Sequence, residues 1–477
     1  MLIHRLYDDD LAQASYLVAC ETTGEAIVVD PNLELDRYLR AAEAERVRIT
    51  CVTETHIHAD FVSGARALAR GTGARLLLSG EGGPEWQYAF AKSDGATLIR
   101  DGDRIEVGRV RLDVLHTPGH TPEHLAFLAT DTASADRPMG MFTGDFVFVG
   151  DVGRPDLLER AAGMAGTMHA AAKQLFRSLQ RLHSLPDYLQ LWPGHGAGSA
   201  CGKALGAVPQ TTLGYERMFN AALRQADEDT FVRDILAGQP EPPRYFARMK
   251  RVNRDGPPVV AEPPAAVPRV EPDAVESTLR RGACVIDTRL SADFIRAFVP
   301  GTICVPRSRS FLGYFGAVAP EQAPVLLLVA RQGDVAPLAR SLRLIGFDEL
   351  LGWAPADGVV EARRKRGQPI GTLESADVQA VRAHLADGRP PTLLDVRTAA
   401  ERQFGQIPGA RAAYLGNLNE ATADLPCELP IIVYCQGGTR AVIGASLLVA
   451  KGFHHVTPMI GGVDAWHAAG LPLVTPS

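Results

Sequence analysis

The side chains best suited to bind a metal ion gather in four short segments of the first half of the chain. The first segment, residues 53–61 (TETHIHADF), places His56, His58 and Asp60 within five positions. Three more clusters follow it: His116-Thr-Pro-Gly-His120, Thr143-Gly144-Asp145 and Pro193-Gly194-His195. Each cluster follows a strand-like run, so its side chains should lie in a loop that a rigid strand positions and that leaves a coordination face open. Histidine and carboxylate ligands from four such loops indicate a metal site.

The order and form of these clusters resemble the metallo-β-lactamase superfamily over roughly residues 1–245. The resemblance implies an αββα sandwich with its ligands in loops at one edge. In dinuclear hydrolases of this superfamily the first motif reads His-x-His-x-Asp-His, and its last histidine binds the second metal ion. This chain has Phe61 there, and a phenyl ring cannot bind a metal. Phe61 argues against a two-zinc hydrolase and fits the persulfide dioxygenases of the superfamily, which hold one non-haem Fe(II).

In that subfamily three motif residues bind the iron, and the corresponding residues here are His56, His120 and Asp145. The resemblance therefore implies one Fe(II) per chain. Two imidazoles and one carboxylate on one face of the ion leave three positions open for substrate and O2.

The other histidine and aspartate residues of the motifs are expected to have supporting roles. His58, Asp60 and His195 match positions that bind metal in dinuclear relatives, and beside a single ion they would orient its ligands or a bound water. His116 and His124 flank the second motif and are interpreted as capped or solvated loop histidines.

Two further residues of the first half could serve the substrate. Arg154 lies in Asp151-Val-Gly-Arg-Pro-Asp156, which also resembles the dioxygenases, and it could pair with a carboxylate of a thiol cofactor such as glutathione. A structural Arg154–Asp156 clamp is the alternative. Cys201 follows His195 by six residues in a Gly-rich loop. We expect it near the metal, where it could relay sulfur or form a mixed disulfide with the substrate.

Length and composition limit the classes of protein to which the chain can belong. A chain of 477 residues is long enough for about three domains, and 46% hydrophobic with 22% charged residues is typical of a globular protein. A net charge of −6 offers no basic face for nucleic acid, and no apolar run is long enough to cross a membrane. Residues 1–10 turn acidic before an apolar signal segment forms, so we expect a cytoplasmic protein. Seven cysteines without a Cys-x-x-Cys pair indicate no disulfide framework.

A Pro-rich stretch and an internal repeat divide the chain. Residues 254–271 are predicted to be a semi-rigid linker after a first domain at 1–253. Beyond it, two segments repeat at an offset of 108 residues: Asp287-Thr-Arg289 matches Asp395-Val-Arg397, and Val299-Pro-Gly301 matches Ile407-Pro-Gly409. Further matches are offset by 106 residues. Each copy alternates short apolar strands with helical stretches, which predicts two small α/β domains with parallel sheets, at 272–369 and 373–477. The whole chain would thus be a multidomain α/β and α+β protein.

The second copy resembles the rhodanese (sulfurtransferase) family. The motifs that carry this resemblance are Asp395-Val-Arg397, Cys435-Gln436-Gly437-Gly438-Thr439-Arg440 and Gly461-Gly-Val-Asp-Ala-Trp466. The glycines would let the loop curl so that backbone N–H groups point at the Cys435 sulfur. The positive end of the following helix and the charge of Arg440 would stabilise a bound anionic sulfane sulfur. Cys435 is therefore the predicted sulfur-carrying nucleophile, and a buried structural cysteine in a turn is the alternative.

The first copy departs from this pattern. At the 106-residue offset its catalytic position is Val329, and Asp334 stands where the loop arginine belongs. Neither Cys284 nor Cys304 lies at that loop. We expect this copy to be inert as a sulfurtransferase and to hold the other domains in place or pack a subunit interface.

Together the domains resemble persulfide dioxygenase–rhodanese fusions. The resemblance implies oxidation of a low-molecular-weight thiol persulfide, of glutathione or another thiol, by O2 to sulfite. Sulfane sulfur carried by Cys435 and sulfite would give thiosulfate, and the residues allow this step in either direction. A homo-oligomer is expected, without nucleic-acid or membrane partners.

Two other functions stay open at this point. One is a zinc-dependent thioester hydrolase of the glyoxalase II kind fused to a sulfurtransferase, which Phe61 weakens. The other is a non-oxidative sulfur-carrier scaffold with a vestigial metal site, which the complete set of His56, His120 and Asp145 weakens.

Overall fold

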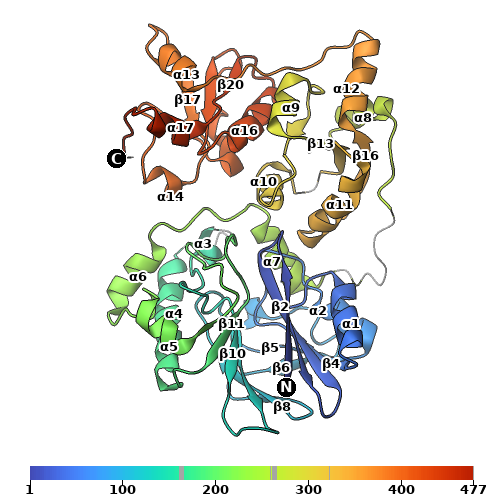
Figure 1. The fold of residues 1–477 in the computed structure, drawn as a ribbon, viewed down its shortest axis with the longest axis vertical. Coiled ribbons are helices and arrows are strands. Elements are labelled where there is room, and N and C mark those ends of the chain that lie inside the picture. Colours follow the sequence, from blue (N-terminus) through green and yellow to red (C-terminus); the bar gives the residue numbers. More distant parts are fainter. Residues whose placement is uncertain (161–165, 258, 260–265, 322, 476–477) are drawn as a thin grey trace. The chain divides into compact units, whose positions relative to one another are not determined.

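The computed structural model describes residues 1–160, 166–257, 259, 266–321 and 323–475. Contacts divide the chain into two compact units (Figure 1). Unit 1 comprises Met1–Pro263 with Leu344–Gly346, and unit 2 comprises Pro264–Arg343 with Phe347–Ser477. Of the expected linker at 254–271, residues 258 and 260–265 lie outside the described residues.

Unit 1 contains two six-stranded sheets. The strands of the first sheet, in spatial order, are β1 (Leu2–Asp8), β2 (Gln13–Cys20), β3 (Glu25–Val29), β4 (Arg48–Thr53), β5 (Arg75–Ser79) and β6 (Thr97–Ile99). Those of the second sheet are β12 (Thr211–Thr212), β11 (Gln190–Pro193), β10 (Gly140–Gly144), β9 (Leu125–Asp131), β8 (Val110–His116) and β7 (Arg104–Val107). β3 to β6 pair in parallel, whereas the second sheet is antiparallel except at β10–β11.

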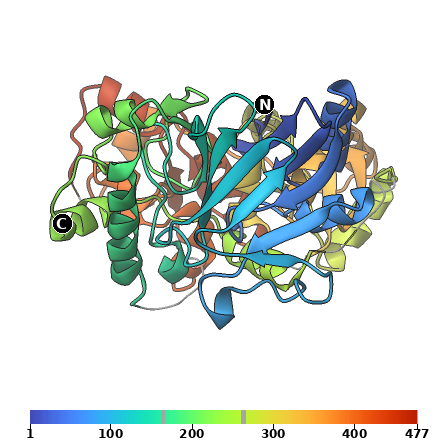
Figure 2. The same ribbon diagram turned by 90° about the horizontal axis from the view of Figure 1, so that it is seen from below.

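Helices cover the outer faces of both sheets. The helices of residues 1–257 are α1 (Leu35–Ala44), α2 (Ala65–Thr72), α3 (Leu157–Arg160), α4 (Met168–Gln180), α5 (Leu213–Phe219), α6 (Glu228–Leu236) and α7 (Phe246–Asp255), with single 3₁₀ turns η1 (Pro84–Trp86) and η2 (Arg181–Ser184). One apolar cluster joins α1 and α2 to the first sheet, and another joins α4 and α6 to the second. Figure 2 shows the blue strands of the first sheet beside the teal and green strands of the second.

Strand β2 explains the layering. Side chains of a strand alternate between its two faces, and here Tyr16 and Val18 enter the cluster between the sheets, while Leu17 and Ala19 enter the cluster beneath α1 and α2. Every residue of β2 is buried as a result. The four layers are helix, sheet, sheet and helix, so the predicted αββα sandwich is confirmed.

Unit 2 contains two four-stranded parallel sheets. Their strands, in spatial order, are β14 (Ile303–Cys304), β13 (Cys284–Asp287), β15 (Val325–Val329) and β16 (Leu350–Pro355), then β18 (Arg411–Ala412), β17 (Thr392–Asp395), β19 (Ile431–Tyr434) and β20 (Val456–Pro458). β15 and β19 are buried along their whole length, as expected of central parallel strands covered on both faces. The prediction of α/β domains with parallel sheets is confirmed.

Short helices connect these strands. Those of residues 272–468 are α8 (Pro272–Arg280), α9 (Ser291–Arg296), α10 (Phe311–Val318), α11 (Val335–Leu344), α12 (Ala356–Lys365), α13 (Val378–Leu385), α14 (Ala399–Arg402), α15 (Leu418–Ala421), α16 (Thr439–Ala450) and α17 (Gly462–Ala468), with η3 (Gln332–Asp334) and η4 (Leu415–Asn417). Among the described residues, no helix combines the length and the apolar character needed to span a bilayer.

Candidate metal centre and persulfide loop

Three buried side chains of unit 1 converge after the ends of β4, β8 and β10. Potential ligand atoms of His56, His120 and Asp145 all lie within 4.8 Å of one another. Asp145 Oδ2 is 3.9 Å from His56 Nε2 and 3.4 Å from His120 Nε2. These are the three residues for which the sequence resemblance implied iron binding.

Hydrogen bonds fix which nitrogen of each imidazole faces this centre. The Thr55 hydroxyl donates to Asp30 Oδ2 (2.9 Å), so it accepts from His56 Nδ1 at 2.9 Å. His120 Nδ1 donates to the Arg154 carbonyl oxygen at 3.1 Å. In both rings Nε2 is left for a metal, as in most protein sites where a polar partner orients the ligating histidine.

The electrostatics also suit a cation. Burial, reinforced by neighbouring histidines, holds the pKa of His56 well below its usual range, and burial also lowers the pKa of His120, so both favour the neutral, ligating form. Neither Asp145 carboxylate oxygen accepts a hydrogen bond from any residue that the structure describes. A buried carboxylate facing two imidazole lone pairs needs a positive charge between them. The donor set fits a divalent metal ion and is the two-histidine, one-carboxylate set of non-haem Fe(II) sites.

His124 supports this centre, and its role was missed in the sequence. The ring is buried and its Nε2 accepts the Asp145 backbone N–H at 3.1 Å. It also stacks on His56, with ring centroids 5.0 Å apart. Of the interpretation as a capped or solvated loop histidine, the solvated form is therefore wrong for His124, which is buried and hydrogen-bonded at both ring nitrogens. The interpretation holds for His116, whose Nε2 caps the same loop by donating to the Pro122 carbonyl at 2.8 Å.

His58 lies beside the centre but points to another partner. Its Nε2 is 3.1 Å from Asp30 Oδ1. Burial opposes its charge, but the Asp30 carboxylate outweighs burial and raises the pKa of His58 to about 9. A protonated imidazole cannot bind a metal. Because Asp30 also accepts from the Thr55 backbone and hydroxyl, His58 stabilises the group that orients His56.

The loop at residues 58–61 is held by a residue distant in sequence. The Asn253 side chain, on α7, donates to the carbonyl oxygens of His58 (2.8 Å) and Phe61 (2.7 Å) and accepts from the Ser63 N–H (2.9 Å). The Phe61 ring is buried, with its centroid 4.4 Å from that of His58. Asn253 belongs to no motif, so there was no reason to select it from the sequence alone.

A second cluster consists of Asp60, His195 and Cys201, all buried, with potential ligand atoms within 4.8 Å of one another. His195 Nε2 is 3.2 Å from Asp60 Oδ2 and 3.5 Å from Asp145 Oδ1, so the two clusters share Asp145. Burial opposes the charge of His195, but the Asp145 and Asp60 carboxylates raise its pKa well above the usual range. Burial raises the pKa of the Cys201 thiol to about 12.

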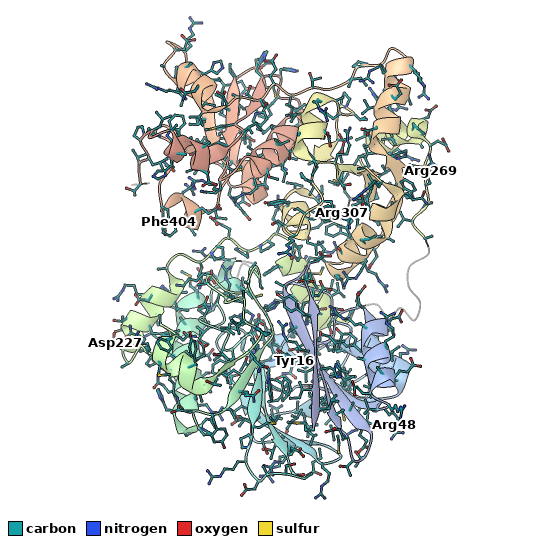
Figure 3. All side chains as sticks on the ribbon, in the orientation of Figure 1. Tyr16, Arg48, Asp227, Arg269, Arg307 and Phe404 are labelled. Carbon is teal, nitrogen blue, oxygen red and sulfur yellow. The ribbon has the colours of Figure 1, made fainter. Side chains whose placement is uncertain are left out.

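The two sheets are tied together next to His195. Tyr16, on β2 and labelled in Figure 3, donates its hydroxyl to the Pro193 carbonyl oxygen at 2.8 Å. The Ala14 N–H donates to the Gly194 carbonyl at 2.8 Å. His195 thus follows a strand that is anchored to both sheets.

Arg154 forms the clamp that the sequence left open as the alternative to a substrate contact. Its side chain is 0% exposed and pairs with Asp156 through Nε and Nη2, both at 2.8 Å. Nη1 donates to the Ala200 carbonyl (3.0 Å) and Nη2 also donates to the Pro240 carbonyl (2.6 Å). This is the structural clamp, and it leaves the guanidinium buried away from solvent. Since the Arg154 backbone carbonyl also accepts from His120, one residue positions both His120 and the chain beside Cys201.

The predicted persulfide loop follows β19 in unit 2. The Gly438 N–H donates to the buried Cys435 Sγ at 3.1 Å, and α16 begins at Thr439. Gly462 allows the loop to approach α17, because a Cβ there would lie 2.2 Å from the Cys435 carbonyl oxygen. Gln436 completes the loop, and its Oε1 accepts from Arg397 Nη1 at 3.2 Å.

The Arg440 guanidinium forms an ion pair with the Glu401 carboxylate. Its Nη1 and Nη2 lie 2.7 and 2.5 Å from the Glu401 carboxylate. Burial opposes the charge of Arg440, but Glu401 and, more weakly, Cys435 raise its pKa. Arg440 is therefore a fixed positive charge near the sulfur, held in place by a glutamate that precedes it by 39 residues.

Comparison with known families agrees with this division. A model described as the metallo-beta-lactamase superfamily matches residues 8–195, and one described as a rhodanese-like domain matches residues 377–469. The chain belongs to the metallo-beta-lactamase superfamily and carries a rhodanese-like domain after the sandwich, which confirms the sequence-based assignment.

Three individual proteins are similar to this chain over different shares of its length. The crystal structure of a metallo-beta-lactamase from Staphylococcus aureus subsp. aureus COL is 38% identical with a TM-score of 0.67, covering 75% of this chain and 99% of that one. A hydroxyacylglutathione hydrolase of Polaromonas sp. is 28% identical over 53% of this chain and 98% of its own length. The mitochondrial persulfide dioxygenase of Homo sapiens is 28% identical over 41% of this chain and 68% of its own length.

Proposed function

We propose that the chain oxidises a low-molecular-weight thiol persulfide with O2 at one Fe(II) and transfers sulfane sulfur through Cys435. In the oxidation the terminal sulfur of R–S–SH leaves as sulfite, O2 and one water supply its three oxygens, and R–SH and two protons are released. The main observation in support is the buried set of two imidazoles and one carboxylate, with Phe61 in place of a further histidine. The similarity to a persulfide dioxygenase adds support.

His56, His120 and Asp145 would hold the metal, which would supply the place where the persulfide sulfur and O2 react. The chain's part is to keep both imidazoles neutral and aimed, through Thr55 and the Arg154 carbonyl. His124 fixes the Asp145 backbone. The buried setting excludes water that would compete for the open positions.

The sulfurtransferase step needs only Cys435 and its loop. The Cys435 thiolate would attack the sulfane sulfur of a persulfide, the donor S–S bond would break, and the donor thiol would leave. Sulfite would then attack the outer sulfur, release thiosulfate and restore the thiolate. The Gly438 N–H, the start of α16 and Arg440 surround this sulfur with positive charge. The reverse step, from thiosulfate to a thiol persulfide, uses the same residues.

The proposed domains are 1–253, the inert copy at 272–369 and the active copy at 373–477. All seven cysteines are free, which fits the reducing cytoplasm that we propose as its location.

Oxygen uptake by the iron-loaded protein with glutathione persulfide tests the oxidation. His120→Ala and Asp145→Ala should abolish uptake but leave thiosulfate:cyanide sulfurtransferase activity intact. His116→Ala is the matched control, because it removes a histidine of the same loop that only caps it. Uptake by iron-free protein, or none by the iron-loaded protein, would refute the proposal.

Product analysis tests whether the two activities act in sequence. Wild-type protein given persulfide and O2 should release mostly thiosulfate, whereas Cys435→Ser should release mostly sulfite at similar oxygen uptake. A dilute mixture of Cys435→Ser and His120→Ala should give less thiosulfate than wild type, because linkage raises the local sulfite concentration. Equal thiosulfate from Cys435→Ser alone would remove the rhodanese-like domain from the reaction.

A second candidate function is zinc-dependent thioester hydrolysis. The hydroxyacylglutathione hydrolase relative and the second cluster of possible ligands favour it. Zinc-loaded protein that hydrolyses a glutathione thioester, with no oxygen uptake in the iron-loaded form, would select this alternative. Transfer of sulfur by Cys435 with neither metal-dependent activity would select a sulfur-carrier scaffold.

A further inference from the structure

Phe404, labelled in Figure 3, has the largest exposed fraction of any large apolar side chain that the structure describes, at 90%. It follows the last residue of α14 by two positions, in the second copy. An aromatic ring left in water forgoes the free energy that its burial would give the fold. Single exposed apolar residues are nevertheless common on protein surfaces, so the place of this one must decide whether it has a function.

The segment that carries Phe404 lies against the Cys435 loop. The carbonyl oxygen of the next residue, Gly405, accepts from Arg397 Nη2 at 2.8 Å. The other terminal nitrogen of Arg397 donates to Gln436 of the loop at 3.2 Å. Helix α14 also carries the glutamate that pairs with the loop arginine. Phe404 is therefore exposed beside the proposed sulfur-carrying loop.

Ile460 flanks the same loop from the segment after β20. A Cβ on Gly438 would lie 3.4 Å from Ile460 Cα, and the Val463 N–H donates to the Cys435 carbonyl oxygen at 2.9 Å. Ile460 is 42% exposed. Two exposed apolar side chains thus come from two separate segments that both border the loop.

The first copy has a charged residue where the second has Phe404. At the 108-residue offset, Arg296 corresponds to Phe404 and Ala297 to Gly405. The Ala297 carbonyl oxygen accepts from Arg289 Nη2 at 2.9 Å, which repeats the contact that Gly405 makes in the second copy. The two segments therefore have the same backbone placement, and the exposed Arg296 is the structural counterpart of Phe404.

The aromatic rings of this segment are inside the first copy. Phe294 and Phe298 are both buried and stack with their centroids 4.4 Å apart. Their counterparts in the second copy are the half-buried Arg402 and Gln406. The segment therefore exposes an aromatic ring in the copy that carries the thiol and buries its rings in the copy without one.

We propose that Phe404 and Ile460 form an apolar rim beside the Cys435 loop, and that this rim contacts the organic group of the thiol that gives or receives the sulfane sulfur. The inference rests on the proposed sulfur transfer and adds the kind of thiol that the site selects, one with an apolar organic group. Cys435 is only 1% exposed, so the reacting sulfur must enter the loop while the organic group stays outside.

The transfer itself explains why the rim discriminates among acceptors. A thiolate R–S⁻ attacks the outer sulfur of the Cys435 persulfide, a new S–S bond forms, the bond to Cys435 breaks, and its electron pair stays on the Cys435 thiolate. The group R is then held beside the loop, where the rim can contact it. Cyanide accepts the same sulfur but carries no such group.

The size of the rim favours a small thiol over a protein partner. A standard protein interface uses about 20–30 residues on each side. Within the described part of the second copy, Val474 is the one further large apolar side chain that is exposed. A few side chains at one loop match the organic group of a low-molecular-weight thiol.

Sulfite release from saturating thiosulfate, with the acceptor varied, tests the proposal in the full chain. The acceptors are cyanide, 2-mercaptoethanol and benzyl mercaptan, which differ in their apolar group. Phe404→Ser should raise the KM for benzyl mercaptan relative to that for cyanide by about 5-fold, as expected for loss of one aromatic contact. The shift should be smaller for 2-mercaptoethanol. Phe404→Tyr keeps the ring and should restore the wild-type ratio, and Ile460→Thr should shift the ratio in the same direction by less.

Leu290→Ser is the matched control, because Leu290 is a 65% exposed apolar residue of the first copy, and it should keep the wild-type KM for every acceptor. An unchanged ratio in Phe404→Ser, or an equal rise in KM for cyanide, would overturn the rim while leaving the sulfur transfer in place. No sulfite release by the wild-type protein with any acceptor would refute the proposed transfer, and the rim with it.

Discussion

The two α/β copies of unit 2 share their framework but differ at the loop after the central strand. In the first copy Leu328 pairs with Asp287, and in the second Tyr434 pairs with Asp395, so Val329 occupies the position of Cys435. The charged residue of the loop also differs in sign between the two copies. Arg440 pairs with Glu401 in the second copy.

In the first copy the corresponding loop position carries a negative charge instead of a positive one. Asp334 stands at the position of Arg440 and pairs with Arg307 and Arg331 (Figure 3 labels Arg307). A carboxylate there would repel an anionic sulfur. The shared framework therefore carries loops of opposite charge in the two copies.

The largest expected effect is on Cys435. Cys435→Ser should reduce thiosulfate:cyanide sulfurtransferase activity to background, because Val329 gives the first copy no thiol. Cys427→Ser should keep wild-type activity in the same assay. Activity that survives in Cys435→Ser would mean that another cysteine carries persulfide and that the alignment of the two copies is wrong.

The next largest effect concerns a clamp that both copies retain. Arg289 pairs with Asp287, and Arg397 with Asp395, all four buried. Replacing either arginine with alanine leaves a buried carboxylate unpaired and should cost about 3–5 kcal/mol of unfolding free energy, measured by urea denaturation with peptide-resolved hydrogen exchange.

The two clamps differ in the partner of the arginine Nη1 group. Comparing the two arginine variants can therefore separate an effect on stability from an effect on activity. Arg289 Nη1 donates to Asp357 at 2.8 Å, whereas Arg397 Nη1 donates to Gln436 of the persulfide loop at 3.2 Å. Only Arg397→Ala should therefore also lower sulfurtransferase activity at temperatures where the variant is folded. An equal loss of activity in Arg289→Ala would show that the copies are coupled more tightly than their loops indicate.

A smaller effect should depend on pH. Burial opposes ionisation of Glu401, but Arg440 outweighs burial and lowers its pKa to about 2, below the ~4.3 of an unfolded chain. The stability from this pair is complete above about pH 4.3 and is lost as the pH falls toward 2. Glu401→Gln should thus cost about 1 kcal/mol at pH 7 because the pair is partly exposed. A difference from wild type that fails to shrink on acidification would contradict this.

The smallest expected effect is from adding a thiol to the first copy. Val329→Cys, in the Cys435→Ser background, should restore no sulfurtransferase activity, because Asp334 remains in its loop. Restored activity would show that the thiol alone separates the two copies. Adding Asp334→Arg in the same background would then measure what the loop charge contributes.

The sequence predicted contiguous features well. The fold class, the rhodanese-like motif and the convergence of His56, His120 and Asp145 follow from short motifs at strand ends. For Arg154 the sequence left a substrate contact and a clamp with Asp156 open, because a motif does not reveal burial, and the structure shows the clamp.

Contacts between segments that are distant in the sequence could not be predicted from such short motifs. Asn253 reaches the 58–61 loop from α7. It has no motif, since three-dimensional proximity across many residues leaves no local periodicity or spacing. Cys201 was expected near the metal from its position six residues after His195, and it lies in one cluster with Asp60 and His195. His124 lay next to a motif, yet its part in orienting Asp145 depends on the β9–β10 geometry.

Helix α16 has a consequence for how this protein can be divided. Residues 441–448 are all buried, although one helix has only one face to offer its own sheet. The other face contacts β14 and α9 of the first copy, and the Cys304 N–H donates to the Ser446 hydroxyl at 2.9 Å (Figure 1 shows α16 beside α9).

A gene fragment that encodes only residues 373–477 would therefore expose an apolar stripe that begins next to the Cys435 loop. Such a fragment should aggregate or require compensating polar substitutions. The first copy, which we expect to be inert as a sulfurtransferase, would then still be needed to cover this face of α16.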